Sequence, residues 1–233
     1  MKLGLSTMTR NQGTRLKEWV TYHNNLGVDK FIIFLDNCTD DSQSILSEIK
    51  DIDIDVYLTS EIKPNQVVDS WILRSHKMYD FTLENYSDLD WICFIEVDEF
   101  IYPQTNTEFK PFLESLDSEC LYINSWDFKG GFDENLPIIG QSNLVWTDKQ
   151  RFNSEYIWRG KSVIRPKKFI KCMDAHHFMR SDGTISTEFK IKHINFIQVN
   201  HGKEVTIDDT LFRIFHFRNH TPSHMTNYKV IEY

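Results

Sequence analysis

Three acidic residues follow an apolar run in the middle of the chain. Residues 91–103 read WICFIEVDEFIYP, so the run leads directly into Glu96, Asp98 and Glu99. An apolar run with polar flanks is typical of a buried strand. Because side chains alternate along a strand, Glu96 and Asp98 are predicted to share one face, with Glu99 on the other. Crowded carboxylates favour a bound cation such as Mg²⁺ or Mn²⁺, and a solvated acidic loop is the alternative.

A fold that brings other groups to the same strand end is needed to complete such a site. Up to residue 103, apolar runs alternate with segments of helical periodicity. This alternation predicts an α/β fold with a parallel, doubly wound sheet, in which ligands bind beyond the carboxyl ends of the strands. The loops expected to meet there are 7–13, 36–41 and 96–100.

Local signals define the first helix and its neighbours. Apolar residues at helical spacing run from Leu16 to Leu26, with Thr14 as the expected N-cap and Gly27 as the stop. His23 lies on the apolar stripe, so it is predicted to be packed rather than to bind a ligand. Residues 40–42 (DDS) are expected to cap the next helix, and a long helix is predicted for residues 66–86.

Several motifs together resemble one enzyme family. EVDEF resembles the D-x-D-E-F signature of nucleotide-sugar-dependent glycosyltransferases with the GT-A fold, particularly the family 92 group and its family 2 relatives. LKEWVTYHNNLGVDKFIIFLDNCTDDS, over residues 16–42, is similar to the opening of that family. The segments WDFKG (126–130), GKSVIRP (160–166) and LFRIFHFRNHT (211–221) are similar to later elements.

The resemblance implies a fold and a division of the chain. We expect one GT-A-like domain over residues 1–233, with a Rossmann-type, mostly parallel sheet flanked by helices. Residues 1–103 would form the nucleotide-sugar-binding half, and residues 104–233 a smaller acceptor-side lobe. At 233 residues, the chain is long enough for one such domain with a substantial core.

The resemblance also implies a metal site. Glu96 replaces the first aspartate of the motif, and its extra methylene leaves Asp98 as the stronger ligand candidate. His216 lies on the histidine of the late motif, which makes it a further expected ligand. Imidazole beside carboxylate favours Mn²⁺ over Mg²⁺. Glu96 is assigned to the nucleotide-sugar-binding residues.

Other expected donor-binding residues lie at the strand ends. By resemblance Asp36, with Asn37, approaches the nucleoside, and a carboxylate can accept a hydrogen bond from uracil N3. Thr7 and Arg10 belong to the polar loop after the first strand, where Arg10 can face a phosphate and a solvated loop is the alternative.

Phosphate contacts and a general base complete the expected site. Arg74 and Lys161 are assigned to the diphosphate, with solvated positions as the alternatives. Inverting transfer, which the resemblance implies, needs a general base on the acceptor side. Asp127 is the predicted base, and Asp208 and Asp209 are the next candidates.

Composition excludes some classes of protein. A net charge of −8 argues against a general nucleic-acid binder, which needs clustered Lys and Arg. No apolar run approaches the ~20 residues of a membrane span, and the N-terminal apolar segment is too short for a secretory signal. The four cysteines are widely spaced and are predicted to be reduced and buried. A cytoplasmic protein is therefore expected.

The sequence thus predicts a metal-dependent glycosyltransferase. It would move a sugar from a nucleotide diphosphate donor, a UDP-sugar by our assignment, to a hydroxyl of a glycan or glycoconjugate, with inversion. The same acidic cluster leaves a metal-dependent phosphodiesterase or phosphatase as an alternative. A carbohydrate-binding module without catalytic activity is the other.

Overall fold

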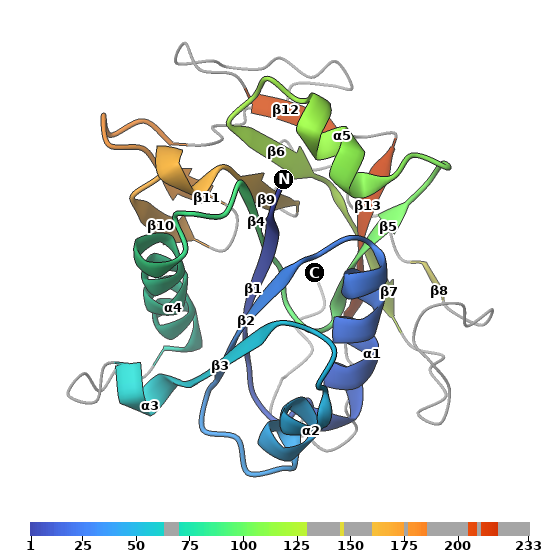
Figure 1. The fold of residues 1–233 in the computed structure, drawn as a ribbon, viewed down its shortest axis with the longest axis vertical. Coiled ribbons are helices and arrows are strands. Elements are labelled where there is room, and N and C mark those ends of the chain that lie inside the picture. The colour runs from blue at the N-terminus through green and yellow to red at the C-terminus, as the bar shows by residue number, and fades with distance from the viewer. Residues whose placement is uncertain are drawn as a thin grey trace, which may run out of the picture.

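The computed structural model describes residues 1–62, 70–129, 145–146, 160–174, 177–185, 205–208 and 211–218. Its main feature is a seven-stranded sheet (Figure 1). In sheet order the strands are β12 (Val205–Asp208), β6 (Cys120–Ile123), β9 (Lys161–Ile164), β4 (Trp91–Phe94), β1 (Leu3–Thr9), β2 (Lys30–Leu35) and β3 (Ile54–Leu58). Among these seven strands, β9 alone runs antiparallel to its neighbours.

Two smaller sheets complete the described strands. One has the order β5 (Glu99–Pro103), β13 (Phe212–Arg218), β7 (Ser125–Lys129) and β8 (Val145–Trp146). The other pairs β10 (Lys171–Asp174) with β11 (His177–Met179). The described helices are α1 (Gly13–Asn25), α2 (Ser42–Glu48), α3 (Thr59–Ile62), α4 (Trp71–Asn85) and α5 (Phe109–Ser115), with a short 3₁₀ turn at Pro166–Lys168. The α/β fold with a mostly parallel sheet flanked by helices is confirmed.

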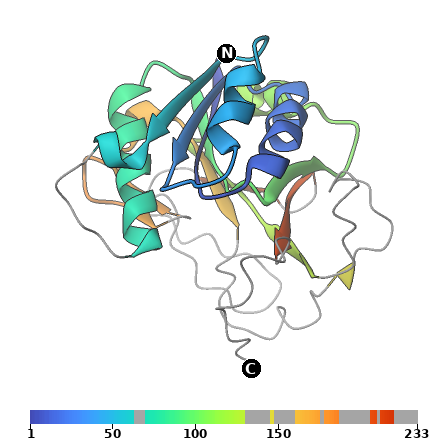
Figure 2. The ribbon, with the colours of Figure 1, turned by 90° about the horizontal axis from the view of Figure 1, so that it is seen from below.

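The central strands β2 and β4 consist almost entirely of apolar residues, as is typical of strands with both faces covered by helices. Along β2, Phe31 and Ile33 pack into the core that contains Trp19 of α1, while Ile32 and Phe34 pack into the core that contains Met78 of α4. Figure 2 shows α4 on one side of these strands and α1 with α2 on the other. Each fully buried large apolar side chain contributes about 1.5–3 kcal/mol to this packing.

Helix α1 begins earlier in the chain than the sequence predicted. The helix begins at Gly13, so Thr14 is not the N-cap, and Gln12 occupies that position without a side-chain cap. Asp40, in the loop before α2, replaces the missing cap, since its Oδ2 accepts a 2.9 Å hydrogen bond from the Gly13 N–H. The stop was predicted correctly, because Gly27 follows the helix at φ +106°.

The structure also bears on the expectations for His23, for the long helix, for the cysteines and for a membrane span. His23 is fully buried, which confirms that it is packed. Of the long helix expected over residues 66–86, the described part is α4, and residues 63–69 lie outside the description. The four cysteines are free, with three buried and Cys38 half-buried. Within the described ranges, no helix has both the length and the apolar character that a membrane crossing requires.

The acidic motif does not lie on one continuous strand, as the alternation predicted. β4 ends at Phe94, and the chain turns before β5 begins at Glu99 in the second sheet. A hydrogen bond of 2.9 Å from the Glu99 N–H to the Glu96 carbonyl closes the turn. Strict alternation of side chains fails across this turn, which changes the predicted placement of Glu99.

Strands from both parts of the chain build the large sheet. β6, β9 and β12 come from beyond residue 103, yet they extend the sheet formed by β1 to β4. The functional division into 1–103 and 104–233 stays a prediction.

Candidate donor and metal site

The acidic turn meets β13 at the carboxyl end of β4. β13 runs antiparallel to β5 with His216 opposite Glu99, and the Phe217 N–H donates to the Asp98 carbonyl at 2.8 Å. His216 Nε2 lies 3.4 Å from Asp98 Oδ2, and His216 Nδ1 lies 3.6 Å from Glu99 Oε1. The two residues assigned to the metal from the sequence are therefore neighbours in space.

Lys161, at the start of β9, joins the same cluster. Its Nζ lies 3.2 Å from Glu99 Oε2 and 3.9 Å from Glu96 Oε1. The residue is 4% exposed, so the alternative of a solvated lysine is wrong. Gly160 lets the chain pass close to β6 at this point, because a Cβ there would lie 2.5 Å from the Ile123 carbonyl oxygen.

Burial and charge shift the protonation of this cluster. Burial raises the pKa of Glu99 above its usual value. Burial opposes the charge of Lys161, but the Glu99 and Glu96 carboxylates outweigh it and raise the pKa of the ammonium. Burial similarly opposes ionisation of Asp98, and the neighbouring His216 outweighs it and lowers the pKa of this carboxyl. A buried ammonium thus lies between the buried Glu99 and the partly exposed Glu96.

The donor set fits a divalent cation. Glu96, Glu99 and His216 can place ligand atoms within 4.8 Å of one another, and Asp98 contacts the same histidine. The 3.4 Å between His216 Nε2 and Asp98 Oδ2 suits a shared ion, since adjacent ligands at ~2.1 Å from Mg²⁺ lie roughly 3 Å apart. The side chains of Glu96 and Asp98 are 38% and 30% exposed, so a ligand can reach them.

Glu99 is the residue of this cluster that the sequence misplaced. It was expected on the opposite face from Glu96 and Asp98, but the turn after β4 brings it to the same side, at 1% exposure. Sequence reasoning missed the tight turn at residues 96–99 (EVDE), which interrupts the alternation of side chains. Such a turn is set here by the pairing of β5 with β13, a contact distant in sequence.

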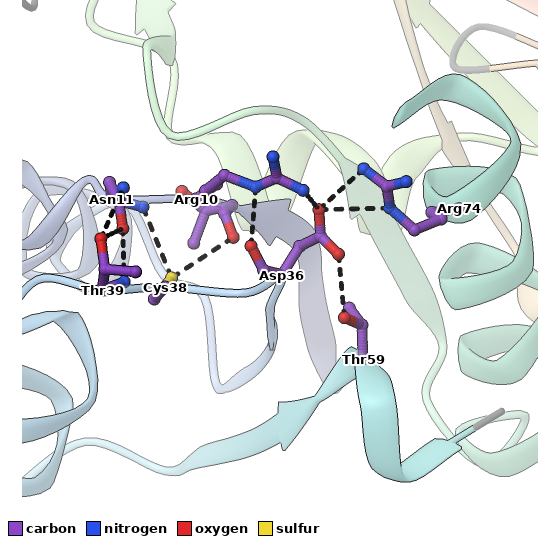
Figure 3. A network of polar contacts seen from close by, with 8 residues as sticks. Arg10, Asn11, Asp36, Cys38, Thr39, Thr59 and Arg74 are labelled. Carbon is purple, nitrogen blue, oxygen red and sulfur yellow. Dashed lines mark hydrogen bonds and ion pairs between the residues drawn. The ribbon is translucent and has the colours of Figure 1, made fainter. Parts of the chain in front are cut away.

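A second polar network surrounds Asp36 at the end of β2 (Figure 3). Its carboxylate is fully buried, and Oδ1 accepts a 2.9 Å hydrogen bond from the Thr59 hydroxyl. Oδ2 accepts hydrogen bonds from Arg74 Nε and Nη2, at 3.2 and 3.1 Å, and from Arg10 Nη2. Arg10 Nε also donates to the Asp36 carbonyl at 2.8 Å. The network holds together the ends of β1 and β2 and the starts of α3 and α4.

The loops that follow β1 and β2 are joined to each other beside this network. Thr39 N–H donates to Asn11 Oδ1 at 2.7 Å, and Asn11 N–H donates to the sulfur of Cys38 at 3.4 Å (Figure 3). Asn11 and Asn37 both adopt left-handed backbone conformations, with φ +52° and +49°. Asn37 is exposed at the turn directly after Asp36.

The structure corrects the expected positions of two other assigned residues. β1 continues to Thr9, so Thr7 is fully buried within a strand and is not part of a loop. Arg74 is half-buried and ion-paired with Asp36, so the alternative of a solvated helical face is wrong. Arg10 follows β1 directly, and its guanidinium also lies 5.6 Å from the centre of the Trp71 ring.

The two networks lie along one edge of the large sheet. Asp36 follows β2 and Glu96 follows β4, and β1, which ends just before Arg10, lies between these strands. Parallel neighbours are about 4.8 Å apart. The strand ends are also staggered, because β2 ends opposite Thr9 of β1 and β4 ends opposite Ser6. Both networks therefore lie beyond the carboxyl ends of neighbouring strands of this sheet, where ligand sites of α/β sheets are expected.

The expected general bases are placed only in part. Asp127 lies on β7, and the register of this strand pairs it with His216 of β13. Asp208 lies on β12, where it pairs with Ile123 at the far edge of the large sheet. Asp209 lies outside the described residues.

Comparisons with known proteins complement this geometry. A glycosyltransferase family 92 protein from Arabidopsis thaliana is 28% identical over 216 residues, which is 87% of this chain and 35% of that protein. One from Ricinus communis is 33% identical over 189 residues, or 76% of this chain and 31% of the relative. The chain thus spans about a third of the length of these relatives.

Two solved structures are similar at lower levels. HddC from Yersinia pseudotuberculosis matches with a TM-score of 0.46 and 13% identity, over 91% of this chain and 92% of that one. Glucosyl-3-phosphoglycerate synthase from Mycobacterium tuberculosis, in complex with Mn²⁺, UDP and glucosyl-3-phosphoglycerate, matches with a TM-score of 0.37 and 15% identity, over 56% and 44% of the chains.

The family assignment rests on the sequence profile. The profile of Glycosyltransferase family 92 matches residues 5–233, which include all the elements described above except the first two residues of β1. The motifs that suggested this family lie at the carboxyl end of β4, at the end of β2 and on β13, where the structure gathers its polar groups. The chain belongs to glycosyltransferase family 92.

Proposed function

We propose that this chain is a metal-dependent glycosyltransferase that uses a UDP-sugar and transfers its sugar, with inversion, to a hydroxyl of a glycan or glycoconjugate. The observation that supports this proposal is the meeting of Asp98, Glu96 and His216 at the carboxyl end of β4. In a family 92 chain, partly exposed carboxylates and an imidazole that meet next to a buried lysine are best explained by a bound cation and the diphosphate of a donor.

In this proposal Asp98 and His216 hold Mn²⁺, or Mg²⁺ in its place. Such an ion neutralises the negative charge that develops on a departing diphosphate. Glu96 borders the same space, and its half-exposed carboxylate orients the donor there. Lys161 keeps a buried positive charge on this side of the sheet, close to where the diphosphate would lie.

The nucleoside is assigned to the end of β2. A carboxylate has about four lone-pair sites, so Asp36 Oδ1, which accepts from Thr59, has one left for uracil N3–H. Because Asp36 is fully buried, uracil would reach this atom only after part of the network opens. The Arg10 side chain, at 40% exposure, is more exposed than that of Arg74 and is therefore the partner that we expect to move. Arg10 and Arg74 then carry positive charge beside the donor, and the exposed Asn37 borders it.

The general base is assigned to Asp127. Inversion needs a base that removes the proton of the acceptor hydroxyl on the face opposite the leaving group. The pairing of β7 with β13 places Asp127 next to His216 in register, which supports this assignment over Asp208 at the far edge of the sheet.

A donor screen tests the proposed function. UDP-, GDP- and dTDP-sugars are added with and without Mn²⁺, and the melting temperature is measured, followed by product analysis with glycan acceptors. We expect stabilisation by a UDP-sugar only with Mn²⁺, and release of UDP. Release of UMP or inorganic phosphate would instead indicate a phosphodiesterase or phosphatase, and metal-independent sugar binding would indicate a binding module.

A further inference from the structure

Glu99 makes contacts that distinguish it from the other carboxylates of the acidic cluster. Its side chain is 2% exposed, whereas those of Glu96 and Asp98 are 38% and 30% exposed. Oε2 accepts a 2.8 Å hydrogen bond from the Glu96 N–H and lies 3.2 Å from Lys161 Nζ. Two donors therefore occupy this oxygen, and the other oxygen, Oε1, faces His216.

The two ring nitrogens of His216 face different carboxylates. Nδ1 lies 3.6 Å from Glu99 Oε1, and Nε2 lies 3.4 Å from Asp98 Oδ2. A neutral imidazole carries its proton on one nitrogen and a lone pair on the other. A proton on Nδ1 would face the buried Glu99, and a proton on Nε2 would face the partly exposed Asp98, so the tautomer decides which side of the ring has a lone pair for a cation.

We propose that Glu99 is a positioning residue that holds His216 as the Nδ1–H tautomer and aims Nε2 at the cation beside Asp98. Lys161 and the Glu96 N–H anchor Oε2, so Oε1 is kept on the histidine side. A carboxylate behind a metal-bound histidine orients the ring and increases its basicity. This inference rests on the metal-dependent function proposed above.

The same contacts determine what an amide at this position would do. In Glu99→Gln, the two donors that now face Oε2 would hold the amide oxygen. The amide nitrogen would then face His216 and donate to Nδ1. The ring would have to carry its proton on Nε2, where it cannot bind a metal.

The tautomer is measured first, in metal-free protein with ¹⁵N-labelled histidine. Long-range ¹H–¹⁵N NMR spectra are recorded well above the ordinary histidine pKa of about 6.5, and His216→Gln identifies the signal. We expect Nδ1–H in the wild type and Nε2–H in Glu99→Gln. The Nε2–H form in the wild type overturns the proposal without any variant at residue 99, even if Glu99→Gln fails to fold.

Mn²⁺ affinity is measured next, by titration followed by electron paramagnetic resonance. We expect Glu99→Gln to weaken binding about 10- to 100-fold, the range for lost partners behind metal ligands. Glu119→Gln is the matched control, because Glu119 is also ion-paired, with Arg180, but lies outside the cluster. Its affinity should equal that of the wild type.

A double-mutant cycle separates positioning from direct ligation. If Glu99 acts through His216, Glu99→Gln should change affinity less than about twofold in a His216→Gln background. A further loss of about tenfold would make Glu99 a ligand itself and overturn the proposal. Wild-type affinity in Glu99→Gln overturns this inference alone, whereas a wild type that binds no Mn²⁺ overturns it together with the proposed metal dependence.

Discussion

At the scale of single residues, the carboxylates of the acidic turn differ in exposure, and we therefore expect them to differ in role. Asp98 is partly exposed and contacts His216, so it is available to a cation without being part of the core. Glu99 is buried and already engaged by Lys161. Neighbouring residues of the same charge can therefore be tested separately.

Asp98→Asn should abolish Mn²⁺ binding and leave the fold intact. The amide keeps the shape of the side chain but removes the charge that a hard cation prefers. Asp88→Asn is the matched control, since Asp88 is an exposed aspartate in the turn before β4. Isothermal titration calorimetry measures binding, and circular dichroism checks the fold. Mn²⁺ affinity within twofold of the control would remove Asp98 from the metal site.

At the scale of elements, the Asp36 network connects the ends of β1 and β2 to α3 and α4. Its aspartate is fully buried, so we expect the network to stabilise the fold, in addition to the role in donor binding proposed above. α1 is connected to β5 in a similar way, because the Trp19 indole donates to the Glu99 carbonyl and the Tyr22 hydroxyl donates to the Ile101 carbonyl, both at 2.9 Å.

Asp36→Asn should lower the free energy of unfolding by roughly 1.5–3 kcal/mol. The amide retains one acceptor but leaves the charges of Arg10 and Arg74 without their buried counter-ion. Asp53→Asn is the control, since Asp53 is 66% exposed in its ion pair with Lys30 and should cost less than about 1 kcal/mol. Urea denaturation measures both variants. If Asp36→Asn were as stable as the wild type, the network would not stabilise the fold.

His23 should make the protein less stable in acid. Burial lowers its pKa from 6.5 to about 3. Nδ1 lies 2.8 Å from the Trp19 carbonyl and donates to it, while Nε2 accepts from the Ile101 N–H, so the folded protein holds the neutral ring. Below pH 6.5 the unfolded chain binds a proton that the folded chain does not. Stability therefore falls as pH decreases from 6.5 towards 3, at about 1.4 kcal/mol per unit.

Urea denaturation at pH 7 and pH 5 tests this dependence. Between these values the wild type should lose about 2 kcal/mol more than His23→Gln, which has no titrating ring. The comparison cancels the carboxylates that titrate in both proteins. The same loss in both proteins would contradict the assignment of this acid sensitivity to His23.

At the scale of the whole molecule, the site joins the two main sheets. The acidic turn leaves the large sheet at the end of β4 and enters the second sheet as β5, and His216 approaches it from β13. A ligand that binds Asp98 and His216 together therefore stabilises the contact between these sheets. Such a ligand would raise the free energy of unfolding of the whole chain, because it would bind the folded chain and not the unfolded one.

Mn²⁺ with UDP should raise the melting temperature of the wild type. At a ligand concentration 100 times Kd, binding adds about 2.7 kcal/mol, equivalent to roughly 5–10 °C for a chain of this size. His216→Gln should lose most of this shift while its melting temperature without ligand stays close to that of the wild type. Differential scanning fluorimetry measures both. A full shift in this variant would exclude His216 from the site.

The sequence by itself determined the layers of the fold and indicated which polar residues would lie near one another. The apolar run of β2, the periodicity of α1 and the stop at Gly27 depend on short-range patterns, and these were predicted correctly. Likewise, His23 lies on the buried face of its helix, as its position in the pattern indicated. The family motifs assigned Asp98 and His216 to one metal site, and in the structure His216 Nε2 lies 3.4 Å from Asp98 Oδ2.

Tertiary structure alone decided the contacts around these residues. The turn that brings Glu99 into the cluster depends on the pairing of β5 with β13, and the burial of Lys161 depends on the insertion of β9 between β4 and β6. Asp36 meets two arginines because the ends of β1 and β2 and the start of α4, which are distant in sequence, come together at one edge of the sheet. Local periodicity carries no information about such pairings, since they are set by which strands become neighbours.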